Sequence, residues 1–227
     1  MSARDPDGTE DGAAAAMTVD IVSDVVCPWC YIGKRRLEAA LAMRAGPAPV
    51  VRWHPFQLNP DIPAGGVDRR SYLEEKFGGP ERARDVYARV EAAGREVGIP
   101  FRFERIDRQP NTSDAHRLIA WAQQVAPASA DRLVEHLFRA YFTEGVDIGA
   151  VDELARLAGE SGCDPEVARA HLESVAGREE TVEADARMRS MGIGGVPFFI
   201  FNRRLAVSGA QPPEVLADAL AQAETAT

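Results

Sequence analysis

The chain has 227 residues, enough for one large domain or for a compact core that carries an insertion. Hydrophobic residues make up 45% of it, which is ordinary for a globular protein. The formal net charge of −9 argues against nucleic acid and anionic membranes as partners, because both favour basic surfaces.

The first 16 residues are acidic and rich in Gly and Ala. They lack the basic start and the sustained apolar stretch of a secretory signal, and no later apolar run reaches the length of a membrane span. We therefore expect a disordered tail over residues 1–16, a folded part that begins at Met17, and a cytoplasmic location.

A predicted strand over residues 18–26 leads directly into a Cys-Pro-Trp-Cys motif and then into a helix predicted over residues 28–44. Cys27 falls at the strand-to-helix junction, where free backbone N–H groups and the helix dipole stabilise a thiolate. Pro28 suits the first helical turn, because its missing N–H costs nothing there. Cys30 lies one turn further on, within reach of Cys27. The pattern indicates a nucleophilic thiol with a resolving partner.

Other interpretations of the cysteine pair are weaker. Zinc needs further nitrogen or sulfur ligands, usually with a short spacing of their own, and we predict no metal site. The remaining candidate ligands are scattered along the chain: Cys163, His54, His116, His136 and His171. A purely structural disulfide across so short a loop restrains the unfolded chain little. Two buried, inert cysteines remain an alternative, but the Pro and Trp between them give this interpretation no support.

The strand predicted over residues 50–58 completes a strand–helix–strand unit, the first half of a thioredoxin-like motif with a right-handed crossover. Helical periodicity then fills the middle of the chain. The clearest helical segments are residues 81–97, a segment capped by residues 111–114, and residues 130–143, 151–157 and 167–172.

Strand character returns at residues 196–201 and 205–207, and a last helix follows Pro213. The chain is thus predicted to be an α/β protein with a thioredoxin-like fold and a large all-helical domain inserted between its two halves. We expect the thioredoxin-like domain at residues 17–64 and 188–227, and the inserted domain at residues 65–187.

Val196-Pro197 opens the third predicted strand after a glycine-rich stretch. A proline at this point is tolerated at a strand start or at an edge, and that plain interpretation weighs as much as any functional one for the dipeptide alone. The upstream cysteine motif favours the functional interpretation. A cis bond forms readily only before proline, and it leaves the Val196 N–H and C=O free to pair with an extended substrate.

Together these motifs resemble the DsbA-type branch of the thioredoxin superfamily, and more narrowly the FrnE-like group, close to 2-hydroxychromene-2-carboxylate isomerases and kappa-class glutathione transferases. The resemblance covers nearly the whole chain after residue 17. The stretches that carry it are residues 23–33, 56–60, 110–118, 194–199 and 208–211. The isomerase relatives have a serine where this chain has Cys27, which favours thiol–disulfide exchange here.

The resemblance implies that the Val196–Pro197 bond is cis, that its loop lies beside the disulfide and that His116 faces the active-site cleft. A lone histidine on a helix is more often structural or exposed. Asn111 is first a helix cap and only second a site residue. Gln211 is expected near the γ-glutamyl end of a bound glutathione.

We predict a thiol–disulfide oxidoreductase that acts on protein or low-molecular-weight thiols, with Cys27 and Cys30 as catalytic residues. The Pro28-Trp29 pair tunes the couple. Trp29 either presents an apolar face to substrate or packs on the inserted domain. Asp24 is either a proton relay or an ordinary strand-end carboxylate.

No cofactor is expected to be required, although glutathione is a candidate, and the protein is expected to be a monomer or homodimer. The first alternative is a glutathione-dependent isomerase or transferase acting on an aromatic or polyketide-like small molecule. The second is a non-catalytic binding protein.

Overall fold

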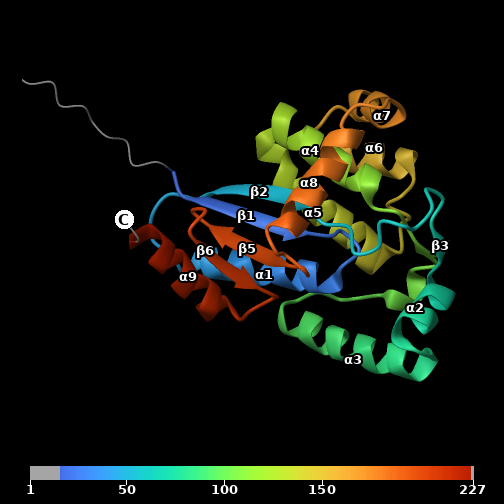
Figure 1. Cartoon of the computed structure of the whole chain (residues 1–227), viewed down its shortest axis with the longest axis horizontal. Coiled ribbons are helices and arrows are strands. Elements are labelled where there is room, and N and C mark those ends of the chain that lie inside the picture. The colour runs from blue at the N-terminus through green and yellow to red at the C-terminus, as the bar shows by residue number, and fades with distance from the viewer. Residues whose placement is uncertain (1–15, 226–227) are drawn as a thin grey trace, which may run out of the picture.

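The computed structural model describes residues 16–225 and is built on a four-stranded sheet in the order β2-β1-β5-β6 (Figure 1). Strand β1 (Thr18–Ser23) runs parallel to β2 (Val50–Pro55) and antiparallel to β5 (Phe198–Phe201). The edge strand β6 (Leu205–Ser208) pairs antiparallel with β5. The two halves of the sheet therefore come from opposite ends of the chain.

Helices cover both faces of this sheet (Figure 1). Helices α1 (Pro28–Ala42) and α9 (Pro213–Thr225) pack against each other on one face, while α8 (Arg178–Ser190) lies against β2 on the other. Side chains alternate between the faces along each strand. Val22 accordingly packs with Met188 of α8, while Val19 and Ile21 of the same strand belong to the main core.

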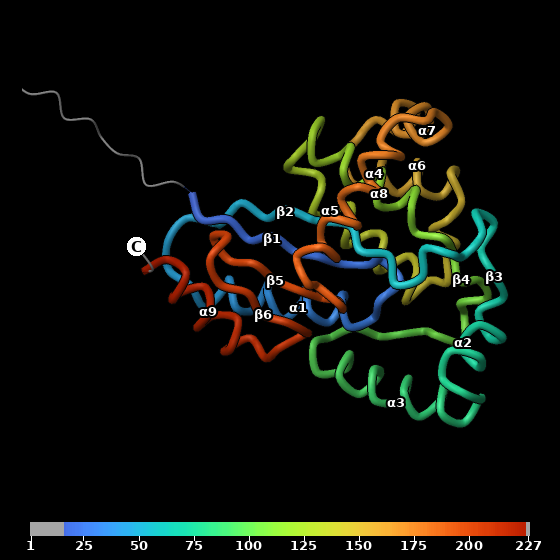
Figure 2. The backbone as a smooth tube through the Cα atoms, in the orientation of Figure 1, coloured from blue at the N-terminus to red at the C-terminus, as the bar shows by residue number. Residues whose placement is uncertain are grey.

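Between β2 and β5 the chain is mostly helical (Figure 2). The helices that precede α8 are α2 (Arg69–Phe77), α3 (Pro80–Glu96), α4 (Ser113–Val125), α5 (Pro127–Arg139), a π-helical turn (Ala140–Glu144), α6 (Val151–Glu160) and α7 (Pro165–Glu173). A 3-10 turn (Phe103–Arg105) lies between α3 and α4. The predicted α/β thioredoxin-like fold with a helical insertion is confirmed.

The insertion also contains one element of sheet that was not predicted. The two-residue strands β3 (Val67–Asp68) and β4 (Arg108–Gln109) pair antiparallel at the end of the molecule that also holds α2 (Figures 1 and 2). Strands this short carry no hydrophobic alternation, so no sequence pattern indicates them.

Strand β2 ends at Pro55, three residues before the end predicted from the sequence. The Phe56 N–H still donates to the Ser23 carbonyl of β1 at 3.1 Å, but the next two N–H groups donate to side chains. The Gln57 N–H donates to the Asp185 carboxylate at 2.7 Å and the Leu58 N–H donates to the Asp24 carboxylate at 2.8 Å. These two bonds turn the chain away from the sheet.

Helices α2 and α8 were not identified from the sequence. Helix α8 buries only Thr181, Asp185 and Met188, so it shows no apolar stripe. Helix α2 buries only Arg69 and Leu73. Its boundaries did carry a usable signal, because Asp68 accepts a hydrogen bond from the Ser71 N–H as an N-cap and Gly78 ends the helix at φ +75°.

Two buried cations tie the elements together. Lys34 of α1 is only 3% exposed and lies among the carboxylates of Glu38, Asp131 and Glu135, the last two from α5. Arg117 of α4 is 1% exposed and donates to backbone carbonyls at the C-terminal end of α7 and in the loop that follows it. A buried charge is stable only with such partners. Lys34 therefore ties the insertion to α1, and Arg117 ties α4 to α7 within the insertion.

Within the described part of the chain, no helix combines the length and the apolar character needed to cross a membrane. The tail predicted over residues 1–16 falls outside the described residues except for its last position.

Candidate functional site

The cysteine motif begins at the junction between β1 and α1. Cys27 is the N-cap of α1 with an extended backbone (φ −94°, ψ 111°), and Pro28 takes the first helical position. The Cys27 N–H donates to the Asp24 carbonyl at 3.0 Å, and the Cys27 carbonyl accepts the Cys30 N–H at 3.0 Å. The backbone hydrogen bonds of the strand, the turn and the helix therefore set the backbone positions of Cys27 and Cys30 independently of the two cysteine side chains.

Both cysteines are buried, and Cys27 is 5% exposed. Cys30 is 2% exposed, and burial raises the pKa of its thiol well above the ordinary value. The neighbouring Cys27 acts in the same direction, whereas the Ser23 hydroxyl and the Asp24 backbone act against it. Both cysteines are free thiols in this structure. Cys30 is thus held protonated at neutral pH.

The segment Val196-Pro197 lies directly against Cys27. The peptide bond between these two residues is cis, and the Cys27 thiol donates to the Val196 carbonyl with a sulfur–oxygen distance of 3.8 Å. Gly33 makes this approach feasible, because a Cβ atom there would lie 2.9 Å from Pro197 Cγ and 3.2 Å from Phe199 Cζ. The strand predicted from Val196 accordingly begins only at Phe198.

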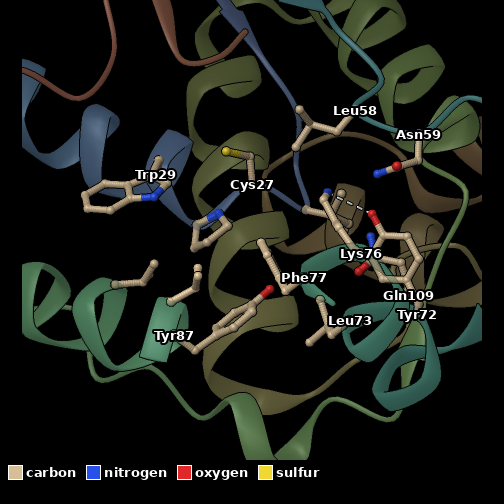
Figure 3. Close-up of a pocket in the computed structure, with 14 residues that line it drawn as sticks. Cys27, Trp29, Leu58, Asn59, Tyr72, Leu73, Lys76, Phe77, Tyr87 and Gln109 are labelled. Atoms are coloured by element: carbon tan, nitrogen blue, oxygen red, sulfur yellow. Dashed lines mark hydrogen bonds between the residues drawn. The ribbon is translucent and has the colours of Figure 1, made fainter. Parts of the chain in front are cut away.

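A cleft of about 200 Å³ opens beside Cys27 (Figure 3). One wall consists of the cysteine motif, and the opposite wall consists of side chains from α2 and α3. The lining residues are Val26, Cys27, Pro28, Trp29, Leu58, Asn59, Tyr72, Leu73, Lys76, Phe77, Val86, Tyr87, Val90 and Gln109. Among the described residues that line it, Lys76 alone carries a charge, and its ammonium donates to the Tyr72 hydroxyl at 2.9 Å.

Trp29 stands at the edge of this cleft with 38% of its surface exposed. Pro28 also lines the cleft. The structure therefore brings the predicted residues Cys27, Pro28 and Trp29 together around one cavity, with the Val196 carbonyl at the Cys27 sulfur.

Three other predicted site residues are not among those that line the cleft in the described chain. Asn111 accepts from the Ser113 N–H at 2.9 Å at the start of α4, and its amide donates to the Ile62 carbonyl. The exposed Gln211 donates to the Ser208 carbonyl. His116 is 5% exposed and lies against Asp24 in the interior. Asn111 thus ties the start of α4 to the segment around Ile62, and Gln211 braces a local turn.

The cleft wall formed by Tyr72, Lys76, Phe77 and Tyr87 was absent from the sequence-based prediction. The spacing of Tyr72, Lys76 and Phe77 places them on one side of a helix, but that helix had not been recognised. Gly33 was also missed, because only the tertiary structure shows which atoms a side chain there would meet.

Residues 16–225 contain no cluster of three or more His, Cys, Asp or Glu side chains arranged to hold a metal ion. Cys163 lies half-buried in the turn between α6 and α7, and burial raises the pKa of its thiol.

Comparison with known proteins places this geometry in a family. The model of the DSBA-like thioredoxin domain matches residues 18–221. A crystal structure described as a probable DsbA oxidoreductase from Streptomyces coelicolor shares 33% sequence identity, with coverage of 93% of this chain and 92% of that one and a TM-score of 0.82.

Two more distant structures share the fold. A 2-hydroxychromene-2-carboxylate isomerase is 18% identical with a TM-score of 0.68, and the match covers 90% of this chain and 95% of that one. The cytosolic disulfide reductase DsbM from Pseudomonas aeruginosa, solved with GSH, is 20% identical with a TM-score of 0.62, and the match covers 91% of this chain and 99% of that one.

Proposed function

We propose that this chain, which belongs to the DSBA-like thioredoxin family, is a thiol–disulfide oxidoreductase whose nucleophile is Cys27 and whose resolving thiol is Cys30. The observation that carries the proposal is the position of Cys27. Its sulfur lies at the N-terminus of α1, beside a cleft and 3.8 Å from the Val196 carbonyl. Cys30 follows one helical turn later and is buried.

The chemistry follows from these positions. The Cys27 thiolate attacks one sulfur of a substrate disulfide, a new S–S bond forms, and the other substrate sulfur leaves as a thiolate that takes up a proton. Cys30 then loses its proton and attacks the Cys27 sulfur, which releases the second substrate thiol. Two electrons pass from the cysteine pair to the substrate, and the reverse sequence oxidises a dithiol.

The backbone of Val196 supports substrate binding in an extended conformation. A main-chain N–H and C=O next to the reacting sulfur can pair with the main chain of a peptide or of glutathione. The apolar wall of α2 and α3 opposite Cys27 suits an apolar group next to the substrate's sulfur. Glutathione and cysteine-containing peptides are therefore the substrates we propose, with no resident cofactor.

The decisive measurement is the reduction potential of the Cys27–Cys30 pair. Purified protein is equilibrated in glutathione buffers of graded ratio and its free thiols are trapped. A reversible couple between about −270 and −120 mV supports the proposal. Failure of the pair to form an intramolecular disulfide in any buffer would refute it.

The second candidate is a glutathione-dependent isomerase or transferase for an aromatic small molecule, and the aromatic side chains of the cleft favour it. Tyr72, Phe77 and Tyr87 line the space next to Cys27. The variant Cys27→Ser separates the two functions, because an isomerase tolerates serine at this position and a dithiol exchanger does not. Activity retained by Cys27→Ser would move the isomerase to first place.

We also propose membership of the FrnE-like group and action in the cytoplasm. The motifs around residues 23–33 and 194–199 support the first. A relative of the same fold whose title describes a cytosolic disulfide reductase supports the second. Gel filtration of the purified chain tests the expectation of a monomer or homodimer.

A further inference from the structure

One of the buried cations of this protein has no anionic partner. Lys34 and Arg117 both lie against carboxylates. Arg69, at the start of α2, is 6% exposed, yet within the described chain it forms no ion pair and its Nε has no hydrogen-bond partner. A buried charge is costly unless an opposite charge compensates it. An unpaired guanidinium in the interior therefore points to an anion that a ligand supplies.

Aromatic rings hold the Arg69 guanidinium in place. Its Cζ lies 4.9 Å from the centroid of the Tyr87 ring and 5.5 Å from the centroid of the Phe103 ring. Ring faces attract a cation, but they carry no net negative charge and compensate the buried charge only in part. Because Tyr87 lines the cleft beside Cys27, these contacts keep the guanidinium immediately behind a wall of the cleft.

The Tyr87 hydroxyl connects this guanidinium with the cleft. The hydroxyl is directed into the cleft (Figure 3). Burial raises the pKa of this hydroxyl, the positive charge of Arg69 opposes that rise, and the charge of Cys27 adds to it. The hydroxyl therefore lies within electrostatic range of both the guanidinium and the reacting sulfur. It stays protonated at neutral pH and is available as a hydrogen-bond donor.

The charge distribution around α2 favours an anion in the cleft. None of the described residues that line the cleft is Asp or Glu, and Lys76 adds a second positive charge there, although the whole chain has a net charge of −9. A neighbouring hollow of about 550 Å³, which Arg69 also lines, contains four carboxylates. These belong to Asp68, Glu74, Glu104 and Asp107. An anion is therefore repelled from that hollow and attracted to the cleft.

We propose that the cleft selects thiols and disulfides that carry a carboxylate on an apolar group, with Lys76 and the Tyr87 hydroxyl binding the carboxylate and Arg69 attracting it from behind Tyr87. The proposal rests on the oxidoreductase function proposed above and specifies its substrate class. Cys27 reacts with the sulfur while the apolar cleft wall covers the group next to it. Arg69 is a positioning residue, because it acts through its charge and through Tyr87.

Two aromatic disulfides that differ in charge test this proposal. 5,5′-Dithiobis(2-nitrobenzoate) carries a carboxylate on each ring, whereas 2,2′-dithiobis(5-nitropyridine) is uncharged. Both release a coloured thiol when Cys27 attacks. Reduced protein carrying Cys163→Ser is mixed with each disulfide at neutral pH in a stopped-flow instrument. The readout is the ratio of the two rate constants, carboxylate-bearing over uncharged.

The variants are Arg69→Met, Lys76→Met and the control Arg70→Met. Arg70 is the neighbouring residue, its side chain is 85% exposed and it is not among the described residues that line the cleft. Arg69→Met and Arg70→Met therefore change the net charge equally and differ in where the charge is lost. Urea denaturation of each variant measures its free energy of unfolding.

We expect the ratio to fall about tenfold in Arg69→Met, the order of magnitude that Coulomb's law gives for one unit charge across a partly solvated cleft. Lys76→Met should lower it about threefold, because the exposed ammonium is more strongly screened. In Arg70→Met the ratio should stay within about twofold. The free energy of unfolding should not fall in Arg69→Met, because an apolar side chain replaces a charge without a partner.

Several outcomes would overturn the proposal. One is an unchanged ratio in Arg69→Met, and a lower free energy of unfolding in that variant would then show that Arg69 serves only the packing of α2. Another is an equal fall of the ratio in Arg70→Met, because net charge alone would then explain it. If Arg69→Met does not fold, an unchanged ratio in Lys76→Met overturns the proposal.

Failure of the oxidoreductase function itself would look different. The parent protein would then react with neither disulfide, or it would release only one coloured thiol per molecule because Cys30 does not close the disulfide. A parent that releases two thiols from both disulfides, with a ratio that no substitution changes, would refute only the selection of acidic substrates.

Discussion

The close approach of α1 to Pro197 makes Gly33→Ala the most informative single substitution. A Cβ atom at position 33 would lie 2.9 Å from Pro197 Cγ and 3.2 Å from Phe199 Cζ. Carbon atoms in ordinary contact are about 3.5–4.0 Å apart, so the helix or the proline must move by roughly half an ångström or more. The Cys27 sulfur and the Val196 carbonyl, which lie on these same two segments, would be displaced from each other.

Two opposing free-energy contributions set the expected effect on stability. Overpacking of a tight interior costs about 1–3 kcal/mol, whereas replacing glycine with alanine inside a helix stabilises it by about 1 kcal/mol. We therefore expect Gly33→Ala to lower the free energy of unfolding by about 1 kcal/mol. Urea denaturation followed by circular dichroism measures this change. The release of thionitrobenzoate from 5,5′-dithiobis(2-nitrobenzoate) measures the rate at which Cys27 attacks a disulfide, and this rate should fall.

A matched control is available at Gly159 in α6. There an added Cβ would meet Pro165 Cβ at 3.3 Å, well outside the site, so the variant Gly159→Ala should be neutral or up to about 1 kcal/mol more stable. If Gly33→Ala gains as much stability as Gly159→Ala and leaves the Cys27 rate unchanged, the contact between α1 and Pro197 is not tight and the reasoning is refuted.

Three further predictions concern ionisation and buried contacts. Because burial raises the pKa of Cys30, iodoacetamide at neutral pH should modify Cys27 in the reduced protein and should modify Cys30 only as the pH rises. Peptide mass spectra that show equal labelling of both cysteines near pH 7 would contradict this prediction. Arg117→Met removes the donors to the carbonyls near the end of α7 and the partner of Asp114. The free energy of unfolding, measured by urea denaturation, should therefore drop by about 3 kcal/mol. A loss below about 1 kcal/mol would show that the carbonyls find other donors. Burial, together with the charge and hydrogen bond of Glu135, raises the pKa of Tyr31 from 10.0 to about 12, so the folded state holds this proton more tightly and stability should decline as the pH rises from 10 toward 12. In Tyr31→Phe this contribution to the decline should be absent when the free energy of unfolding is measured against pH. The same dependence of the free energy of unfolding on pH in both proteins would contradict the prediction.

The succession of strands and helices at the two ends of the chain and the cysteine motif were predictable because both depend on local patterns. The apolar, β-branched run before Cys27 and the helical spacing after it are visible in the sequence, and Pro28 marks the first helical turn. The Asp164-Pro165 pair likewise marks the start of α7, where the Asp164 carboxylate accepts from the Glu166 and Val167 N–H groups. Such caps depend on residues only a few positions apart.

Other elements had no local signature. Helix α8 is held by Asp185, whose carboxylate accepts the Gln57 N–H from a segment far away in the sequence, so no apolar periodicity marks it. The same applies to the cleft, whose second wall comes from α2 and α3. Periodicity reports which residues one element buries, and it does not report which other element covers them.

The sequence by itself determined the position of the Cys-x-x-Cys pair at a strand-to-helix junction, which follows from covalent spacing and helix geometry alone, and the proposed nucleophile and resolving thiol follow from that position. Only the tertiary structure decided what surrounds that pair. His116, expected in the cleft, is buried against Asp24, and the cleft is closed by aromatic side chains of α2 and α3. The physical reason is that burial and the contacts between distant segments depend on how the whole chain packs, and these contacts set the protonation of Cys30 and the space beside Cys27.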